Sequence, residues 1–516
     1  MLFQNKTESP DWTPEAKLML KKVPQFILPL VRKTAEREAN KRKMPSVTAE
    51  LLRELAERYS PRKREKFRLE DCYAVETDNP LYGSFPESFL SNGHGEKIQN
   101  ALSENQLNEA WLHAVSQIDD KEEKALYIHT PFCATRCKYC GFFVNGSNPE
   151  ILNRYTKYLI KELQMLADTE GIGNRTFDNV YFGGGTPSDL SAENLEQILS
   201  AVRSFNLSPD CEITLEGRIS SLSENKIAVC RHFGVNRYSL GIQSFNTVLR
   251  RTMGRISTRE TVIEKLQYLR DNADAAIVID QIYGLPGQTM QLWQEDLDIL
   301  FHDCPVDGVD HYPLIRMPET PLDREVKSGV LPAPPSAALR ADMFITALNA
   351  MQRRNVRRVS LKHFAFSPSE RNRYNRLQAY GGCCIPVGCG GGGCFGGYFF
   401  YQGGTLEDYF AMLDQAKKPV TLVSRITGDD ALFNYISGEL LTRCELSLSF
   451  LQQHFSPIID LADCFRPLTK QYAERGLLSI QSDETIRLTP AGQFWNNAIF
   501  QHLKQLYLQI TRGTQK

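Results

Sequence analysis

The chain is expected to fold as an α/β protein around a parallel sheet, because short apolar runs alternate with amphipathic segments from about residue 125 to residue 314. Six runs have the length and apolar character of strands, at 126–129, 179–182, 212–215, 237–242, 276–282 and 309–314. The segments between them carry apolar residues at helical spacing, as at 154–166, 192–205, 224–233 and 258–269. Strands that alternate with helices in this way join through right-handed crossovers into a parallel sheet.

Size and composition narrow the class of protein. A chain of 516 residues is longer than one typical domain, and its 42% hydrophobic content can bury a large core. The formal net charge of −1 gives no general attraction to nucleic acid or to a membrane surface. No apolar run approaches the roughly 18–20 residues that span a bilayer. We therefore expect no nucleic-acid partner and no membrane span.

The cysteines and the first residues indicate the compartment. The 13 cysteines are odd in number and clustered, a pattern typical of reduced thiols and metal ligands rather than of a disulfide framework. The first residues are polar and lack the apolar core of a signal peptide. Both features favour a cytoplasmic enzyme.

The chain divides into five expected parts. Residues 1–75 form a small all-α unit, and residues 76–124 form a linker and the approach to the sheet. The alternating region occupies 125–360, and a glycine- and cysteine-rich segment, expected on the substrate side, follows at 361–420. Residues 421–516 are mainly helical, with a strand-like run at 485–489 that is typical of a winged-helix-like domain.

Three cysteines in one short run are the most informative feature. The run from Tyr127 to Cys140 reads YIHTPFCATRCKYC and contains Cys133 and Cys137. Thiolates at this CxxxCxxC spacing can hold three irons of a [4Fe–4S] cluster and leave the fourth iron open. The open iron suits the amino and carboxyl groups of S-adenosylmethionine (SAM), which a reduced cluster cleaves to a radical. A zinc site, or thiols unrelated to metal, is the alternative.

Polar residues follow at successive predicted strand ends. The run FGGGTP ends the second strand, and its glycines allow close main-chain contact with a ligand. Glu216 ends the third strand, and Gln243, Arg255 and Asp280 come at or after the next two. These residue types suit a polar nucleoside ligand, since carboxylates meet hydroxyls and arginine meets a carboxylate. Each of these residues alone could equally be an ordinary polar residue at the end of a strand. Their occurrence in this order at successive strand ends indicates one pocket.

Together these motifs resemble the radical SAM superfamily, in particular its oxygen-independent coproporphyrinogen III dehydrogenase branch. The resemblance rests on YIHTPFCATRCKYC, GGGTP, Glu216, NRYSLGIQ and DQIYGLP, and it covers about residues 126–314 strongly. It implies an open partial (β/α)6 barrel with the cysteine run at the mouth formed by the carboxyl ends of the strands. This chain departs from the branch at Thr130 and at Gly217 followed by Arg218. Neither departure involves a cluster ligand, so they bear on the identity of the substrate more than on the SAM chemistry.

The resemblance also implies two bound SAM molecules. The positions that match the branch's contacts to the SAM on the cluster are Tyr127, Gly184 and Glu216. The positions that match its contacts to a second SAM are Tyr139, Gly185, Thr186, Gln243, Arg255 and Asp280.

Three groups related to this branch use the barrel differently. Coproporphyrinogen dehydrogenases abstract hydrogen from propionate side chains, and heme chaperones keep the cluster and carry an HNxxYW signature. The matching stretch here is ERNRYNR at 370–376, which has neither that histidine nor that tryptophan. The run LKHFAFSPSERNRYN at 361–375 and the following VGCGGGG resemble the third group, the anaerobic heme-degrading methyltransferases called anaerobilin synthases. We favour this third group and keep the dehydrogenase and the chaperone as alternatives.

The resemblance to the third group implies a reaction and its partners. An electron from flavodoxin or a flavin reductase reduces the cluster, and the radical made from one SAM activates the methyl group of the other. The methyl carbon adds to a meso carbon of the substrate, heme, and the macrocycle opens to a linear tetrapyrrole that no longer holds iron. A heme-carrier protein is a further expected partner.

The N-terminal unit carries a second resemblance. Its pattern, from DWTPEAK at 11–17 to VTAELL at 47–52, looks like the small helical C-terminal module of light-independent protochlorophyllide reductase. In that enzyme the module lies near a bound tetrapyrrole. By this analogy Arg32, Lys33 and Arg37 would meet heme propionates, whereas a solvated basic helix face is the alternative.

Six further residues have two open interpretations each. Cys383, Cys384, Cys389 and Cys394 either hold an accessory cluster or a heme iron, or are incidental reduced thiols in a glycine-rich loop. His311 and His363 are either heme contacts or ordinary polar residues.

Deletion of residues 1–75 tests the interpretation of the N-terminal unit. If the unit contacts substrate, the truncated protein should bind heme more weakly than the full chain in an absorbance titration. Unchanged heme binding and turnover would reduce the unit to an appendage that serves solubility or stability.

Overall fold

The computed structural model describes residues 10–20, 28–42, 44–58, 67–90, 104–141, 145–455, 457 and 459–514. Residues 59–66 of the expected N-terminal unit and residues 91–103 of the predicted linker lie outside these ranges, as does the side chain of Lys33. No helix in the described ranges has the length and apolar character needed to cross a bilayer.

The six predicted strands are present and are parallel neighbours. They are β3 (Lys124–Thr130), β6 (Thr176–Gly184), β7 (Asn206–Gly217), β8 (Arg237–Gln243), β9 (Ala276–Tyr283) and β10 (Gly308–Pro313). Each pairs in parallel with the next in this order. Their carboxyl ends therefore meet at one rim, which confirms the parallel sheet predicted from the alternating pattern.

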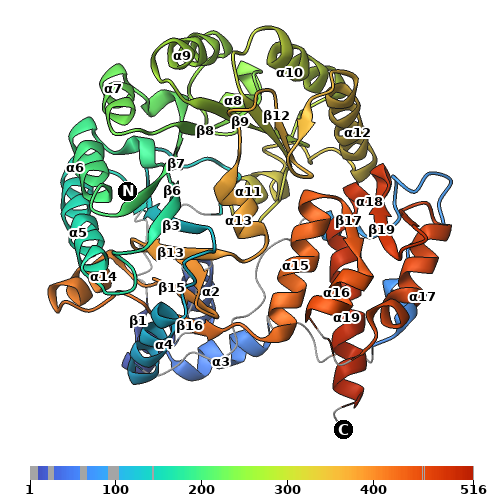
Figure 1. The fold of residues 1–516 in the computed structure, drawn as a ribbon, viewed down its shortest axis with the longest axis horizontal. Helices are drawn as coiled ribbons and strands as arrows, with labels where there is room; N and C mark the ends of the chain where they lie inside the picture. Colours follow the sequence, from blue (N-terminus) through green and yellow to red (C-terminus); the bar gives the residue numbers. More distant parts are fainter. Residues whose placement is uncertain are drawn as a thin grey trace, which may run out of the picture.

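Helices cover the outer face of this sheet, as Figure 1 shows. They are α5 (Pro149–Ala167), α6 (Ala192–Val202), α7 (Glu224–His232), α9 (Arg259–Asn272), α10 (Met290–His302) and α12 (Ala337–Arg353). Two short helices, α8 (Thr247–Thr252) and α11 (Pro321–Lys327), instead lie beside Lys138, whose backbone bonds Met253 and Leu322. Several begin at a polar residue whose side chain accepts a backbone N–H in the first turn, as Asn148 does for α5 and Ser191 for α6. Such caps satisfy backbone donors that a helix leaves unpaired at its start.

The sheet continues beyond the six strands on both sides. Next to β10 come β12 (His363–Ala365) and β11 (Arg357–Arg358), and next to β3 come β13 (Cys383–Val387), β14 (Gly392–Phe395), β15 (Tyr398–Tyr401) and β16 (Leu422–Arg425). The 12-stranded sheet ends at β11 and β16, which are edges and do not pair with each other. The fold is thus the expected open partial barrel, with additional strands.

The glycine- and cysteine-rich segment supplies three of these additional strands. β13 pairs in parallel with β3 and with β14, so Cys383 lies beside both Lys124 and Cys394. The interpretation of this segment as a glycine-rich loop is therefore corrected to strands, which the sequence did not indicate because glycine is depleted in strands and obscures their periodicity. In the structure the glycines allow close strand contact, since a Cβ on Gly393 would lie 2.3 Å from the carbonyl oxygen of Cys384.

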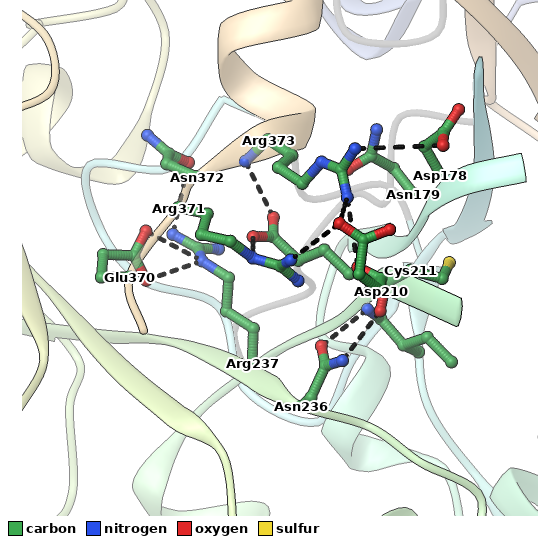
Figure 2. A network of polar contacts seen from close by, with 12 residues as sticks. Asp178, Asn179, Asp210, Cys211, Asn236, Arg237, Glu370, Arg371, Asn372 and Arg373 are labelled. Carbon is green, nitrogen blue, oxygen red and sulfur yellow. Dashed lines mark hydrogen bonds and ion pairs between the residues drawn. The ribbon is translucent and has the colours of Figure 1, made fainter. Parts of the chain in front are cut away.

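A segment after β12 lies at the amino end of the sheet, where Glu370 bonds the first residue of β8, and Figure 2 shows its polar contacts. It leads into α13 (Arg373–Ala379), whose first residue donates its backbone N–H to Glu212 at 2.9 Å and its side chain to Glu123 at 2.8 Å. Glu370 accepts two hydrogen bonds from Arg237, at 3.0 and 3.1 Å, and both side chains are fully buried. Ion pairs therefore join this segment to the amino end of the sheet.

The N-terminal unit has a core of its own. It consists of α1 (Pro14–Leu20), α2 (Leu28–Lys41) and α3 (Ala49–Arg58), with buried residues that include Trp12, Ala16, Val47 and Leu51. It also has two short strands, β1 (Asp11–Trp12) and β2 (Ser46–Val47), which pair in parallel. The expected all-α unit is corrected in this detail, because two-residue strands leave no periodic signal in a sequence.

The C-terminal part is mainly helical, as predicted. Its helices are α15 (Gly428–Thr442), α16 (Leu448–Phe455), α17 (Leu461–Glu474), α18 (Pro490–Phe494) and α19 (Asn496–Thr514). Its strands β17 (Glu445–Ser447), β19 (Thr485–Leu488) and β18 (Leu478–Ile480) form an antiparallel sheet in that order. Two further helices belong to earlier parts of the chain: α14 (Leu406–Asp414) lies between β15 and β16, and α4 (Glu104–Ser116) precedes β3.

Candidate functional site

The three cysteines of the CxxxCxxC run lie on one loop, residues 131–141, which we call the cysteine loop. It leaves the carboxyl end of β3, and its strand β4 (Phe132–Cys133) pairs with β5 (Asn145–Gly146). Cys133 and Cys137 are buried and Cys140 is half-buried, and all three are free thiols. The structure therefore places the run at the rim predicted for it.

Hydrogen bonds from the end of β6 hold the cysteine loop. Gly185 donates its backbone N–H to Thr130 at 2.7 Å, and Thr186 donates its own to Phe132 at 2.8 Å. The hydroxyl of Thr186 lies 3.2 Å from the sulfur of Cys133. The GGGTP run thus positions the first cysteine directly.

The glycines of this run are required by close contact. A Cβ on Gly185 would lie 2.4 Å from the carbonyl oxygen of Phe132, which is far inside van der Waals distance. Gly184 has φ +111°, and a Cβ there would meet the ring of His129 at 2.7 Å. A side chain at Gly185 would therefore push the cysteine loop away from β6, and one at Gly184 would strain the backbone and collide with His129 of β3.

A second polar group lies at the end of β8. Arg255 donates to the hydroxyl of Tyr139 at 3.0 Å, which joins the helix after β8 to the cysteine loop. Gln243 has φ +73°, and its buried side-chain oxygen has no hydrogen-bond partner among the described residues. The Nε of Arg255 is likewise buried without a partner in the part of the chain that the structure describes. Strained backbone and unpaired buried polar atoms are typical of a ligand site.

Two buried carboxylates come from the strands on either side of β8: Glu216 from β7 and Asp280 from β9. Glu216 accepts a hydrogen bond from the hydroxyl of Tyr181, and burial raises the pKa of Glu216. Burial, and then repulsion from Asp310 and Glu216, raises the pKa of Asp280 to about 7. A ligand that brings hydroxyl groups or positive charge would stabilise the ionised form of these buried carboxyl groups.

Three tyrosines stack along the inside of the barrel. The rings of Tyr181 and Tyr374 lie 4.0 Å apart at 20°, and those of Tyr127 and Tyr374 lie 5.7 Å apart at 14°. The Tyr127 hydroxyl lies 2.9 Å from Nδ1 of His129, whose pKa burial lowers to about 4. A neutral, aromatic wall therefore leads from the amino end of the lumen towards the cysteine loop.

The residues present fit a cluster and a nucleoside ligand. Among the described residues, no three His, Cys, Asp or Glu side chains converge on a point where one metal ion would be held. A [4Fe–4S] cube has a different requirement, since each thiolate binds a different iron. The unpaired atoms of Gln243 and Arg255 offer an acceptor and a donor to a polar ligand beside this loop.

The two candidate histidines lie away from the rim. His311 is on the outer face of β10, where it bonds Gln281 at 3.1 Å and packs against Trp293, and burial lowers its pKa to about 3. His363 is fully buried between Asp310, at 2.8 Å, and Glu370, at 3.1 Å. His311 is directed outward because alternate residues of a strand face opposite sides of the sheet.

The remaining cysteines and the N-terminal arginines are also placed. Cys383, Cys384 and Cys389 are buried and Cys394 is half-buried. Burial raises the pKa of Cys383, Cys384 and Cys394, the last to about 11. Arg32 lies 3.6 Å from Glu36 and near the ring of Trp12, and Arg37 is exposed. None of these positions shows which of their two interpretations holds.

Four side chains enter the site that sequence reasoning did not select. Asp310 and Tyr374 face the lumen, the side chain of Lys362 lies over the Tyr312 ring at 5.6 Å, and Arg218 reaches the cysteine loop. Arg218 comes two residues after Glu216, so its proximity to that strand end is a signal in the sequence. Tyr374 comes from a segment distant in sequence and leaves no such signal.

Comparison with known proteins gives two family matches. Residues 127–300 match the model of the radical SAM superfamily, and residues 12–55 match that of the proto-chlorophyllide reductase 57 kD subunit.

Three relatives illustrate the similarity. Anaerobilin synthase of Escherichia coli O157:H7 is 36% identical over 406 residues, which cover 78% of this chain and 89% of the relative. Heme chaperone HemW of Bacillus subtilis is 25% identical over 73% of this chain and 98% of the relative. The structure of coproporphyrinogen III oxidase (HemN) from Escherichia coli superposes with a TM-score of 0.67 at 22% identity, over 77% of this chain and 93% of that one.

The ion pairs of His363 predict a pH dependence of stability. Burial alone would lower the pKa of His363, but Asp310 and Glu370 raise it to about 9. Because the folded pKa exceeds the unfolded value, the contribution is present below the unfolded pKa and is lost as pH rises through about 9. We expect the wild type to lose about 3 kcal/mol more than His363→Gln between roughly pH 6.5 and 9.

Urea unfolding at a series of pH values measures this difference. His302→Gln, which changes an exposed histidine, should follow the wild type. Equal pH slopes for the wild type and His363→Gln would contradict the prediction.

Proposed function

Because the chain belongs to the radical SAM superfamily and to the family of anaerobilin synthase, we propose that it opens the heme macrocycle without oxygen. The products would be free iron and a linear tetrapyrrole of the anaerobilin type, and the reaction a methyl transfer that uses two SAM molecules. The observation that carries this proposal is the 36% identity over 89% of anaerobilin synthase, against 25% over 98% of heme chaperone HemW of Bacillus subtilis.

Family membership confirms several predictions from the sequence. The chain is a radical SAM enzyme, and a [4Fe–4S] cluster and SAM are its cofactors. The resemblance of the N-terminal unit to a protochlorophyllide reductase module is also confirmed. When bound, the reduced cluster supplies the electron that cleaves SAM to a deoxyadenosyl radical.

We propose roles for the residues at the rim. Cys133, Cys137 and Cys140 would hold the cluster, and Tyr127, Gly184 and Glu216 would bind the SAM on it. The second SAM would be bound by Tyr139, Gly185, Thr186, Gln243, Arg255 and Asp280. The unpaired atoms of Gln243 and Arg255 support the second site, since the carboxylate of SAM would accept from Arg255 and its ammonium or ribose hydroxyls would donate to Gln243.

Lys362 is our proposed contact to a heme propionate. Its ammonium lies over the ring of Tyr312 and has no hydrogen-bond or ion-pair partner among the described residues. Burial lowers the pKa of Lys362, with Asp310 opposing the shift. An anionic propionate would restore the charge of this amine, whereas an uncharged edge of the substrate would not.

The proposed partners follow from the chemistry. The cluster needs a low-potential one-electron donor, for which flavodoxin or a flavin reductase is suitable, and a heme carrier would deliver the substrate. All three are found in the cytoplasm, where we place the reaction.

Anaerobic incubation of the reconstituted protein with heme, SAM and a reductant tests the function. We expect loss of the Soret band, iron release, and formation of deoxyadenosine and S-adenosylhomocysteine. Heme that stays bound and intact while SAM remains uncleaved would favour a chaperone. Conversion of coproporphyrinogen propionates to vinyl groups would favour the dehydrogenase instead.

The Lys362→Gln variant tests the propionate contact. We expect it to bind heme about tenfold more weakly, because a hydrogen bond to a charged group contributes roughly 1.5–3 kcal/mol. Heme dimethyl ester, which lacks the propionate charges, should bind both proteins equally. Absorbance titration measures both affinities, and Lys121→Gln, at an exposed lysine, is the control. Equal heme affinity of Lys362→Gln and the wild type would contradict the assignment.

A further inference from the structure

Arg218 joins the end of β7 to the cysteine loop. It follows Gly217, the last residue of β7, and its Nη1 donates to the carbonyl oxygen of Thr135 at 2.8 Å and to the Thr135 hydroxyl at 2.6 Å. Thr135 lies midway between Cys133 and Cys137 in the sequence. One guanidinium thus holds the middle of the segment that carries the first two proposed cluster ligands.

The main chain of Arg218 is itself held in place. Its N–H donates to the hydroxyl of Ser188 at 3.0 Å, and its carbonyl accepts from Ser221 at 3.2 Å. A Cβ at Gly217 would lie 2.7 Å from the Ser188 oxygen, so this contact needs glycine at 217. Gly217 and Arg218 therefore act as a pair: the glycine permits the approach, and the arginine makes the contact.

The charge of Arg218 is buried without a carboxylate partner. Its side chain belongs to a residue that is 9% exposed, and no Asp or Glu of the described residues lies within ion-pair distance. The nearby Asp189 instead accepts the backbone N–H of Ala134 at 2.6 Å. A buried unpaired cation is costly, and it is stabilised when negative charge collects nearby. The three thiolates of a bound cluster would supply that negative charge.

We propose that Arg218 is a positioning residue that holds the cysteine loop through Thr135 and whose positive charge raises the reduction potential of the bound cluster. A cluster gains negative charge on reduction, and a fixed cation at short range stabilises the reduced form. The proposal rests on the proposed ligand set. It goes beyond the proposed function, because it concerns delivery of the electron and is independent of the substrate.

Two substitutions separate the charge of Arg218 from its geometry. Arg218→Gln keeps a donor for Thr135 and removes the charge, whereas Arg218→Lys keeps the charge and removes the forked contact. Thr135→Val removes one of the two acceptors and leaves Arg218 intact. Arg203→Gln makes the same charge change at an exposed position and is the control.

Potential and cluster retention are measured on the full chain after anaerobic reconstitution. In electron paramagnetic resonance titrations, Arg218→Gln should show about a tenfold lower ratio of reduced to oxidised cluster at a fixed potential, or about 59 mV. Arg218→Lys and Arg203→Gln should titrate close to the wild type. Arg218→Lys and Thr135→Val should lose iron to a chelator faster than the wild type does.

If the cluster of Arg218→Gln has the reduction potential of the wild type, the claim that the charge of Arg218 raises the potential is wrong. If both Arg218→Lys and Thr135→Val retain iron as the wild type does, the claim that Arg218 holds the cysteine loop is wrong. If Arg218→Gln folds by circular dichroism but retains no cluster while Arg218→Lys retains one, the charge is required. A wild-type protein that loads no cluster would instead refute the ligand set, and no heme is present in these measurements.

Discussion

The rest of the site depends on the contact between the cysteine loop and the glycine run at the end of β6. Gly185 donates to Thr130 at 2.7 Å, and at that separation a side chain on Gly185 would collide with the carbonyl of Phe132. The parallel pairing of β3 with β6 brings the two segments to the same rim. Because main-chain atoms make this contact, it holds the loop without using the cysteine side chains.

The two ends of the barrel differ in the polar groups that they bury. At the amino end, Arg237 forms a buried ion pair with Glu370 and donates to Asn372 at the start of α13, while its Nη1 and one oxygen of Glu212 have no hydrogen-bond partner among the described residues. At the carboxyl rim, Gln243 and Arg255 keep polar atoms without a partner among the described residues, and the pKa of Asp280 is raised to about 7 by burial and neighbouring carboxylates. Unpartnered buried polar atoms therefore occur at both ends, and those of Gln243 and Arg255 are the ones that lie beside the cysteine loop, where a polar ligand would satisfy them.

The elements that could be predicted from the sequence are those marked by apolar periodicity or by short contiguous motifs. The six parallel strands follow from apolar runs of strand length, and the rim residues from motifs that end those strands. The strands β13 to β15 are harder to predict, because their glycines hide the alternation that marks a strand. His311 and His363 have the chemistry of ligands, yet one packs against Trp293 and the other pairs with Asp310, and only the register of the sheet shows this.

The sequence by itself determined the cysteine spacing, the order of polar strand ends and the likeness to a radical SAM enzyme, because these reside in short contiguous motifs. Only the tertiary structure decided which distant side chains meet. Tyr374 stacks on Tyr181, and Arg218 reaches Thr135, across 193 and 83 positions of the chain respectively. Such contacts depend on strand register and on the path of the loops, which no local pattern encodes.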